Sequence, residues 1–390
     1  MLDNEKAEGA RKIKQIEKYC LRDIAIVSQG FTFSRSYQGK KNLKWNYFKV
    51  ADIGLNPNSK YLTNAINTIS DITMEEIGAL PFPKGSIVFP RVGAALFNNN
   101  KKILAQDGVV DDNVLVLTVT DTSKCWYEFL YYYLQGIPLA KWCNSGLVPI
   151  INTKTVLSQM VFLPPLSEQQ KIAAILSTQD KVIELKEKLL AQKQQQKRYL
   201  MQQLLTGKKR LPGFNEEWQF AKLENVSKYS ASAASFKTYE SHLGCGPYPV
   251  YDATGCFGNI DFYENEQPYI SIVKDGAGAG RVALCKEKSS TIGTLGCIFA
   301  NDIDLLYLFY CMSAVDFQIY SNGSTIPHVY YKDYKNMVLY LPCELEQKAI
   351  VEILSTADHE IDLLQKSIEA EKQKKKSLMQ LLLTGKVRVK

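Results

Sequence analysis

The sequence lacks the features that would place it in a membrane or outside the cell. It contains no uninterrupted apolar run of roughly eighteen residues, so we expect no membrane span. Its charged start, MLDNEKAEGARKIKQIEKYC, has no apolar segment of the kind found in signal peptides. We therefore expect a cytoplasmic protein with no membrane partner.

Metal-binding and disulfide patterns are also missing. The nine cysteines are odd in number, scattered and without a CxxC pair, which argues against a disulfide framework or a zinc site. We expect reduced, mostly buried thiols. His242, His328 and His359 lie far apart without acidic or cysteine companions at ligand spacing, so we expect no metal site and no catalytic triad.

Catalytic motifs are absent too. An enzyme that methylates a flipped DNA base would need an Asn/Asp-Pro-Pro-Tyr/Phe loop, and the only Pro-Pro pair is Pro164–Pro165. The glycine-rich stretch KDGAGAGR at 274–281 lacks the GK[ST] ending of a phosphate-binding loop, and the RVALC that follows is typical of a strand. A glycine-rich hairpin between two strands fits better. An independent modification enzyme is therefore disfavoured, and we expect no cofactor on this chain.

The composition permits a large folded protein. With 390 residues and 46% hydrophobic residues, the chain is long and apolar enough for two domains or more. The net charge of +7 permits a polyanionic partner without requiring one.

An internal repeat organises the chain. LPPLSEQQKIAAILSTQDKVIEL begins at Leu163, and the similar LPCELEQKAIVEILSTADHEIDL begins at Leu341. The register continues without a gap, so YLMQQLLTGK ending at Lys208 matches SLMQLLLTGK ending at Lys386. The plan is therefore variable domain, repeat, variable domain, repeat.

Each repeat is typical of one long helix. Pro164 and Pro165 block a helix upstream, Ser167 and Gln170 are spaced as a capping box, and Gly207 supplies a C-terminal stop. About 38 residues at ~1.5 Å each give a rod of roughly 57 Å. If the second helix returns along the first, the two pair antiparallel about a pseudo-twofold axis.

Apolar residues recur along both helices at alternating steps of four and three, the spacing of a coiled-coil seam. The predicted seam consists of Ile172, Leu176, Ile183, Leu190, Leu200 and Leu204 in the first copy, and Ile350, Leu354, Ala357, Ile361, Leu364, Ile368, Leu378 and Leu382 in the second. An oligomerisation coiled coil is the alternative. It does not explain why two unlike domains alternate with near-identical helices.

The remaining segments alternate short β-branched or aromatic runs with turn residues. Runs at 86–89, 114–117 and 269–273 are typical of strands, and those at 126–134 and 305–313 of short helices. The tyrosines at 131–133 follow a helical pattern and are expected in the core. The expected segments are 1–18 (charged N-terminus), 19–162 (first domain), 163–210 (first helix), 211–340 (second domain) and 341–390 (second helix). The fold class is α+β: two globular domains separated by two long antiparallel coiled-coil helices in a pseudo-twofold, cyclic arrangement.

These features resemble the specificity subunit of type I restriction–modification systems over nearly the whole chain. The residues that carry the resemblance are Leu163–Pro165, Glu168–Gln169 and Ile172–Ala173 at the helix entry, Leu204–Lys208 at its end, and Leu211–Phe214 with Trp218 where the second domain opens. The second entry departs from the pattern at Cys343 and Glu344, and we expect the helix there nonetheless.

The resemblance implies a subunit that does no chemistry itself. It would read a bipartite, non-palindromic site on double-stranded DNA, with one half-site for each target-recognition domain. Two methyltransferase subunits would dock on the helices and carry S-adenosylmethionine, and restriction subunits that use ATP and Mg would join for cleavage. The difference between the two domains agrees with this interpretation, because a palindromic DNA site would need two domains of the same specificity.

Candidate DNA-binding residues combine basic, amide and aromatic side chains near turns, since Arg suits guanine, Asn suits adenine, and Lys and Tyr suit phosphates. They are Arg91, Asn98, Asn99, Asn100, Lys101 and Lys102 in the first domain, and Tyr251, Lys274, Arg281, His328, Tyr330 and Lys332 in the second. For each of them a solvated turn is the alternative.

Two questions stay open at this level. Residues 168–210 carry ten Lys or Arg against four Asp or Glu, an excess that could face DNA, a partner protein or only solvent. The main alternative function is a coiled-coil oligomeric scaffold whose globular domains bind protein or carbohydrate. Salt-sensitive retention on duplex DNA would separate the two functions.

Overall fold

The computed structural model describes residues 16–55, 59–144, 146, 148–323 and 326–389. The chain divides into two compact units, residues 1–188 with 366–390 and residues 189–365. Each unit therefore holds one globular domain and a stretch of both long helices. Of the charged segment expected at 1–18, all but residues 16–18 lies outside the described residues. None of the helices in the described ranges is long and apolar enough to cross a membrane.

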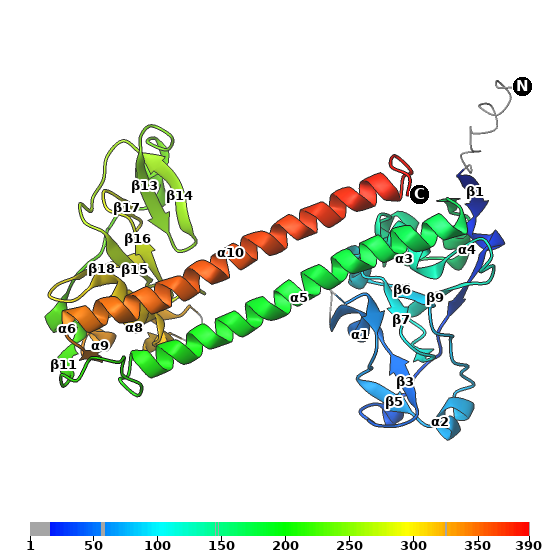
Figure 1. Ribbon diagram of the computed structural model, residues 1–390, viewed down its shortest axis with the longest axis horizontal. Helices are drawn as coiled ribbons and strands as arrows, with labels where there is room; N and C mark the ends of the chain where they lie inside the picture. Colours follow the sequence, from blue (N-terminus) through cyan, green and yellow to red (C-terminus); the bar gives the residue numbers. More distant parts are fainter. Residues whose placement is uncertain (1–15, 56–58, 145, 147, 324–325, 390) are drawn as a thin grey trace, which may run out of the picture. The chain divides into compact units, whose positions relative to one another are not determined.

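The first unit is built on a five-stranded sheet in the order β2-β9-β6-β7-β4 (Figure 1). The strands are β2 (Ala25–Gln29), β4 (Tyr61–Leu62), β6 (Ile87–Pro90), β7 (Lys102–Leu104) and β9 (Val114–Val119). Strand β6 pairs antiparallel with both β7 and β9 and is buried along its whole length. A continuous apolar run, without polar alternation, is typical of such a central strand.

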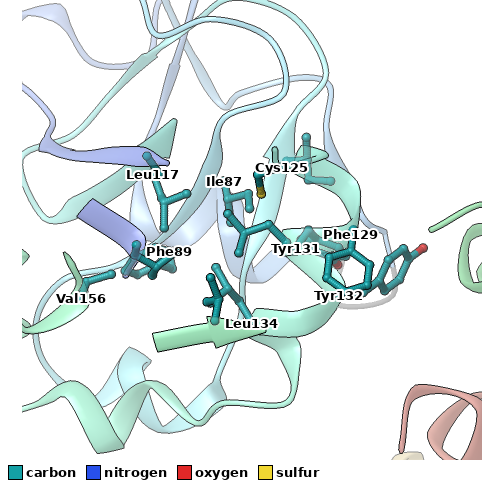
Figure 2. Close-up of a cluster of buried hydrophobic side chains, with 14 of the residues drawn as sticks. Ile87, Phe89, Leu117, Cys125, Phe129, Tyr131, Tyr132, Leu134 and Val156 are labelled. Atoms are coloured by element: carbon teal, nitrogen blue, oxygen red, sulfur yellow. The ribbon is translucent and has the colours of Figure 1, made fainter. Parts of the chain in front are cut away.

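Helix α3 (Tyr127–Gln135) packs against this sheet and completes the main core of the first unit. Figure 2 shows Phe89 and Leu117 of the sheet gathered with Phe129 of the helix. Tyr132 is fully buried in the same cluster, which confirms that the tyrosine run at 131–133 belongs to the core.

The rest of the first unit consists of short elements around this core. A three-stranded sheet has the order β5-β3-β8, with β3 pairing parallel to β8. The elements are β3 (Trp45–Phe48), β5 (Asn67–Ile69), β8 (Val109–Val110), α1 (Val50–Leu55), α2 (Asp71–Glu76), α4 (Thr153–Leu157) and the 3-10 helices η1 (Leu21–Asp23), η2 (Arg35–Tyr37), η3 (Ala94–Asn98) and η4 (Leu139–Trp142).

The second unit repeats this plan. A four-stranded sheet has the order β12-β18-β15-β16, and a three-stranded sheet has the order β14-β13-β17. The strands are β12 (Ser227–Ser230), β13 (Tyr248–Asp252), β14 (Gly255–Ile260), β15 (Tyr269–Val273), β16 (Val282–Cys285), β17 (Ser290–Thr291), β18 (Leu295–Ala300), β19 (Ser321–Asn322) and β20 (His328–Val329). The helices are α6 (Leu223–Val226), α7 (Phe236–Glu240), α8 (Leu305–Ser313), η5 (Phe317–Tyr320) and α9 (Tyr331–Tyr334).

The repeat register extends into both domains. Three pairs of helices begin at the same sequence separation as the repeats at Leu163 and Leu341. The pairs are α3 at Tyr127 with α8 at Leu305, η4 at Leu139 with η5 at Phe317, and α4 at Thr153 with α9 at Tyr331. The two domains, whose sequences hardly match, therefore share one framework.

A two-stranded sheet leads into each long helix. Strand β1 (Glu17–Cys20) pairs with β10 (Met160–Leu163) before α5, and β11 (Gln219–Lys222) pairs with β21 (Val338–Leu341) before α10. The entry to both helices is thus anchored in the same way.

The long helices α5 (Leu166–Leu204) and α10 (Glu344–Leu382) have 39 residues each. The predicted capping box is wrong, because α5 begins one residue before Ser167. Gln169 anchors the start instead: its amide nitrogen donates to the carbonyls of Lys124 (2.7 Å) and Pro164 (2.8 Å), and its amide oxygen accepts from the Trp126 N–H (2.9 Å). These bonds tie the start of α5 to the segment that leads into α3.

Glycine ends both helices as the sequence predicted. Gly207 has φ +67°, and the Lys209 N–H donates to the Gln203 carbonyl at 3.1 Å. Gly385 has φ +70°, and the Val387 N–H donates to the Leu381 carbonyl at the same distance. In both cases the residue two places after the glycine thus bonds back to the last turn of the helix. The left-handed conformation that this reversal needs favours glycine.

In the first unit the two helices run antiparallel and meet through polar groups. Gln179 and Lys186 of α5 donate to the Glu371 carboxylate of α10 at 2.7 and 2.8 Å. These two partners, Lys186 first, lower the pKa of the Glu371 carboxyl to about 2. Lys375 pairs with Asp180 at 2.5 Å. Gln179 and Lys186 stand at seam positions, so the middle of the seam is polar.

The second unit shows the same antiparallel pairing. Lys193 of α5 pairs with Glu360 of α10 at 2.7 Å, and Lys197 pairs with Asp358. Exchanging the two repeats converts the Asp180–Lys375 pair into Asp358–Lys197. Each unit thus has its own copy of the same ion pair.

A second pair of contacts obeys the same exchange. Arg388 forms a bidentate hydrogen bond with Glu168, at 2.8 and 2.7 Å, and Arg210 forms one with Glu346, at 2.9 and 2.8 Å. Trp218 adds a donor to Glu346 at 2.9 Å. Planar Arg–carboxylate pairs of this kind fix geometry as well as charge.

The predicted seam residues divide into two groups. Those near the helix ends are buried in the domain cores: Ile172, Leu176 and Leu382 in the first unit, and Leu204, Ile350 and Leu354 in the second. Ile183 and Ile368 are buried near the polar middle, and Leu190, Leu200, Ala357, Ile361, Leu364 and Leu378 are half-buried. The apolar stripe therefore serves mainly to fix each domain to the helices.

Candidate nucleic-acid interface

In the first domain, a sharp corner follows the central strand β6. The Arg91 N–H donates to the Asn113 carbonyl at 2.8 Å, and the Arg91 carbonyl accepts from the Ile151 N–H at 2.9 Å. Gly93 has φ +80° and donates its N–H to the Pro149 carbonyl at 3.0 Å. We call residues 91–93 and 149–151 the first corner.

The second domain builds the same corner after β15. The Lys274 N–H donates to the Thr294 carbonyl at 2.8 Å, and the Lys274 carbonyl accepts from the Val329 N–H at 2.8 Å. Gly276 has φ +93° and donates to the Pro327 carbonyl at 3.0 Å. Residues 274–276 and 327–329 form the second corner. The structure thus brings together two segments that the sequence singled out separately.

Arg91 and Lys274 occupy equivalent positions in the two corners. Both side chains are half-buried, and in the part of the chain that the structure describes neither charged end has a hydrogen bond or an ion pair. A cation held at a loop without a carboxylate partner is suited to an external anion or to a base acceptor.

A lysine in the helix that follows accompanies each corner. Lys332 is the second residue of α9 and lies with its ammonium 5.5 Å from the Tyr330 ring centre. Lys154 is the second residue of α4, at the matching place in the repeat register. Both are exposed. Lys332 was among the predicted residues and Lys154 was not, although Lys154 holds the matching place in the repeat register.

The predicted Asn98–Lys102 loop is in large part interior. Lys101 is 2% exposed, and its ammonium donates to the Asn99 side-chain oxygen (2.6 Å) and the Ile137 carbonyl (2.9 Å). Lys102 is equally buried and donates to the Ser59 carbonyl. In this structure neither ammonium is placed to meet a phosphate, which corrects the expectation for both lysines.

The two neighbouring asparagines keep some access to solvent. Asn98 is exposed at the end of η3, and Asn100 is half-buried. Asn99 differs, because its side-chain oxygen also accepts the Leu139 N–H at 2.9 Å. Asn99 therefore has a structural role, and Asn98 and Asn100 stay candidates.

Two candidates of the second domain lie beside the corner rather than in it. Arg281 closes the glycine-rich hairpin, because its carbonyl accepts the Val273 N–H at 2.9 Å. The exposed guanidinium of Arg281 donates to the Ala253 carbonyl. Tyr251 is half-buried in β13, where its hydroxyl accepts the Lys286 N–H at 3.4 Å. The hairpin between β15 and β16 is confirmed.

His328 and Tyr330 lie at the second corner. The His328 Nδ1 is 2.7 Å from a carboxylate oxygen of Asp275, and its ring is within 2° of parallel to the Tyr330 ring, with centres 5.8 Å apart. The second corner thus contains two predicted residues, Lys274 and His328, with Tyr330 and Lys332 beside them.

The Lys and Arg excess at 168–210 is partly balanced by acidic residues of α10, which pair with Lys186, Lys193 and Lys197. Other lysines gather around a cavity of the first unit. A cavity of about 450 Å³ is lined by several lysines, among them Lys60, Lys372 and Lys375. Lys60 pairs with Glu128 at 3.3 Å, Lys372 with Glu187 at 2.8 Å and Lys375 with Asp180. These lysines serve internal ion pairs, so the cavity gives no independent evidence of a DNA contact.

The expectation of mostly buried thiols is wrong, because four of the nine cysteines are buried, three are half-buried and two are exposed. Burial raises the pKa of the Cys125 and Cys311 thiols to about 12 and that of the Cys297 thiol to about 11, which keeps these three protonated. Within the described ranges, no group of three His, Cys, Asp or Glu side chains is placed to hold a metal ion.

Comparison with known proteins identifies the family. The model of the type I restriction modification DNA specificity domain matches residues 13–194 and 215–372, one match for each domain with its helix. The MjaX type I restriction enzyme specificity subunit of Methanocaldococcus jannaschii is 25% identical over 405 residues, covering 95% of this chain and 93% of that protein. The MjaVIII specificity subunit of the same organism is 28% identical over 283 residues, covering 62% of this chain and 65% of that protein.

Solved structures agree on the fold. The S subunit of a type I restriction–modification system from M. genitalium matches with a TM-score of 0.63 at 14% identity, over 96% of this chain and 97% of that one. A chain from a structure on complex assembly of a type I system matches with a TM-score of 0.55 at 14% identity, over 95% and 97% of the two chains. The chain therefore belongs to the family of type I restriction–modification specificity subunits, and it carries two DNA specificity domains.

Proposed function

We propose that this chain reads a bipartite, asymmetric site on double-stranded DNA, with one half-site for each domain. The observation that carries the proposal is the pair of corners, which share one backbone frame but present different side chains. One frame in both domains lets each meet DNA in the same way. Different side chains then select different half-sequences.

Within each domain the basic residues make two kinds of contact with DNA. Arg91 and Lys274 lie in the corners themselves and contact bases or the nearest phosphates. The exposed Lys154 and Lys332 contact phosphates beside them and set the position of the duplex. The recognition domains span residues 19–162 and 211–340, and the helices at 163–210 and 341–390 join them.

The helices are the docking surface for two methyltransferase subunits. Leu185 of α5 and Leu363 of α10 hold matching places in the repeats, and each is 52% exposed. Equal exposed apolar residues in two copies suit two copies of one partner. S-adenosylmethionine would be bound by those subunits, and ATP and Mg by restriction subunits, so this chain needs no cofactor. The complex would act in the cytoplasm.

Methylation mapping tests the proposal. The full chain is co-expressed with its methyltransferase partner in a host without other modification, and modified bases are mapped by long-read sequencing. We expect one bipartite, non-palindromic motif that disappears when this chain is omitted. A chain that adds no motif, and whose retention on duplex DNA does not depend on salt, would favour the scaffold function.

A further inference from the structure

One residue pair differs in chemistry at an otherwise identical place in the two corners. Each corner contains a single antiparallel bridge, between Val92 and Ile150 in the first and between Asp275 and His328 in the second. Ile150 and His328 match in the repeat register, and Val92 and Asp275 each follow the basic residue of their corner.

The backbone around the two bridges is the same. The carbonyl of the basic residue, Arg91 or Lys274, accepts a hydrogen bond from the N–H of Ile151 or Val329, at 2.9 and 2.8 Å. The N–H of the corner glycine donates to a proline carbonyl at 3.0 Å in both corners. Only the side chains change, from two aliphatic groups to a carboxylate and an imidazole. The bridge is therefore a place where chemistry can vary without moving the frame.

In the second corner the pair is held in position and remains accessible. The Asp275 and His328 side chains are 36% and 34% exposed and lie 2.7 Å apart. Tyr330 lies parallel to the imidazole ring, and Lys332 lies over Tyr330. Among the described residues, the second carboxylate oxygen of Asp275 and the Nε2 of His328 have no hydrogen-bond partner. Two polar atoms are thus fixed in place and left for an external group.

A carboxylate is an unfavourable group to place against the DNA backbone, because phosphates repel it. It is favourable where it meets an amino group, and in the major groove only adenine N6 and cytosine N4 offer one. Guanine O6 and N7 and thymine O4 are acceptors and would be rejected. Aliphatic side chains instead suit the thymine methyl group.

We propose that this bridge pair determines one base position in each half-site. Asp275, held by His328, selects a base with an exocyclic amino group, adenine or cytosine, in the second half-site. Val92 and Ile150 select a thymine methyl group in the first. The inference rests on the proposed function and adds to it the residues and the class of base that they read.

The test exchanges the two pairs between the corners. The variants D275V/H328I and V92D/I150H are made in the full chain, and each is used with its methyltransferase partner to select duplexes from a randomised pool. The matched control is H242I/D261V, because His242 and Asp261 form a similar pair in the second unit, 2.9 Å apart and 41% and 52% exposed, away from the corner.

We expect D275V/H328I to lose its preference for adenine or cytosine at one position of the second half-site by roughly tenfold to a hundredfold, with the first half-site unchanged. The converse variant, V92D/I150H, gains an amino-bearing base at one position of the first half-site. The control keeps both half-sites.

Unchanged base preferences in both exchange variants would overturn the inference. If wild-type chain selects no bipartite site, the proposed function fails instead, so the two failures are distinguishable. A double variant that loses both half-sites together has lost its fold. D275N then decides, because it keeps the shape of Asp275 but can also donate: a relaxed preference at that one position supports the inference, and an unchanged one contradicts it.

Discussion

Lys101 holds a rare position for a lysine. Its side chain is almost fully buried, and its hydrogen-bond partners are neutral oxygens of Asn99 and Ile137. Burial lowers the pKa of its ammonium from the ordinary 10.5 to about 7. Folding must therefore either bury a charge or release a proton.

We predict that Lys101→Met changes stability in a pH-dependent way. Between about pH 7 and 10.5 the unfolded chain binds a proton that the folded chain does not, so the wild-type free energy of unfolding rises with pH in this window through this group. The methionine variant lacks that slope, so its stability relative to wild type should be highest below pH 7 and should fall as pH increases to 10.5. Denaturant unfolding at pH 6 and pH 9 measures it. Lys141→Met, at an exposed lysine, is the control, and equal differences at both pH values would contradict the burial of the charge.

A second prediction concerns the corners. Arg91→Ala and Lys274→Ala should each weaken specific DNA binding roughly tenfold to a hundredfold while methyltransferase docking stays intact, because neither charged end has a structural partner within the described residues. Binding to a cognate duplex and co-purification of the partner give the two readouts.

Lys228→Ala is the matched control for this pair, since Lys228 is exposed on β12 and outside the corner. Variants of both corner residues that modify DNA at the wild-type rate would show that the corners do not carry the contacts.

Among the elements, the long helices contribute differently along their length. Ile183 of α5 is 7% exposed, whereas its counterpart in the repeat, Ile361 of α10, is half-buried. Replacing them with aspartate therefore tests burial at matching positions.

Ile183→Asp should lower the free energy of unfolding by on the order of 3 kcal/mol, since it removes a buried apolar side chain and puts a carboxylate in its place. Ile361→Asp should cost clearly less, because water reaches that position. Urea unfolding of the two variants, with Leu363→Asp as an exposed control, measures the order. Equal losses at 183 and 361 would mean that burial does not govern these positions.

The elements also show what the sequence can predict. The strand at 269–273 and the helix at 305–313 have the bounds expected from their residue patterns, because local periodicity and turn residues decide such elements. The start of α5 was predicted two residues late, since a capping box at Ser167 would make residue 168 the first of the helix. The contact of Gln169 with Lys124, which anchors this helix start, is not revealed by any local pattern.

For the candidate site, too, local patterns predicted the turns, but not the contacts between residues distant in the sequence. The turns that hold Arg91 and Lys274 could be predicted because glycines mark them, and the DNA contacts of these two residues stay a prediction. The burial of Lys101 and Lys102 could not, because the carbonyls of Ile137 and Ser59 that receive their hydrogen bonds are distant in sequence. A run of asparagine and lysine is ordinarily a solvated loop, and only tertiary contacts show otherwise.

At the scale of the whole molecule, both long helices contribute to both units. The length of these helices should then set the distance between half-sites. Four residues inserted in each helix, around Gln194–Gln196 and at the matching 372–374, add ~6 Å, against ~3.4 Å per base pair.

We expect the unread spacer to grow by about one to two base pairs while both half-sequences stay the same. Four residues also rotate the following segment by roughly 40°, which partly follows the rotation of the added base pairs. Methylation mapping of the lengthened chain gives the spacer directly. Full activity with an unchanged spacer would show that the helices do not set the distance.

The central claim is that two domains on one framework read two different half-sites independently. The most direct test replaces residues 19–160 with the equivalent domain of a relative of different specificity and maps methylated sites in cells that also express the methyltransferase partner. The account predicts a motif with one new half-site, with the second half-site unchanged. A change in both half-sites, or in neither, would contradict it.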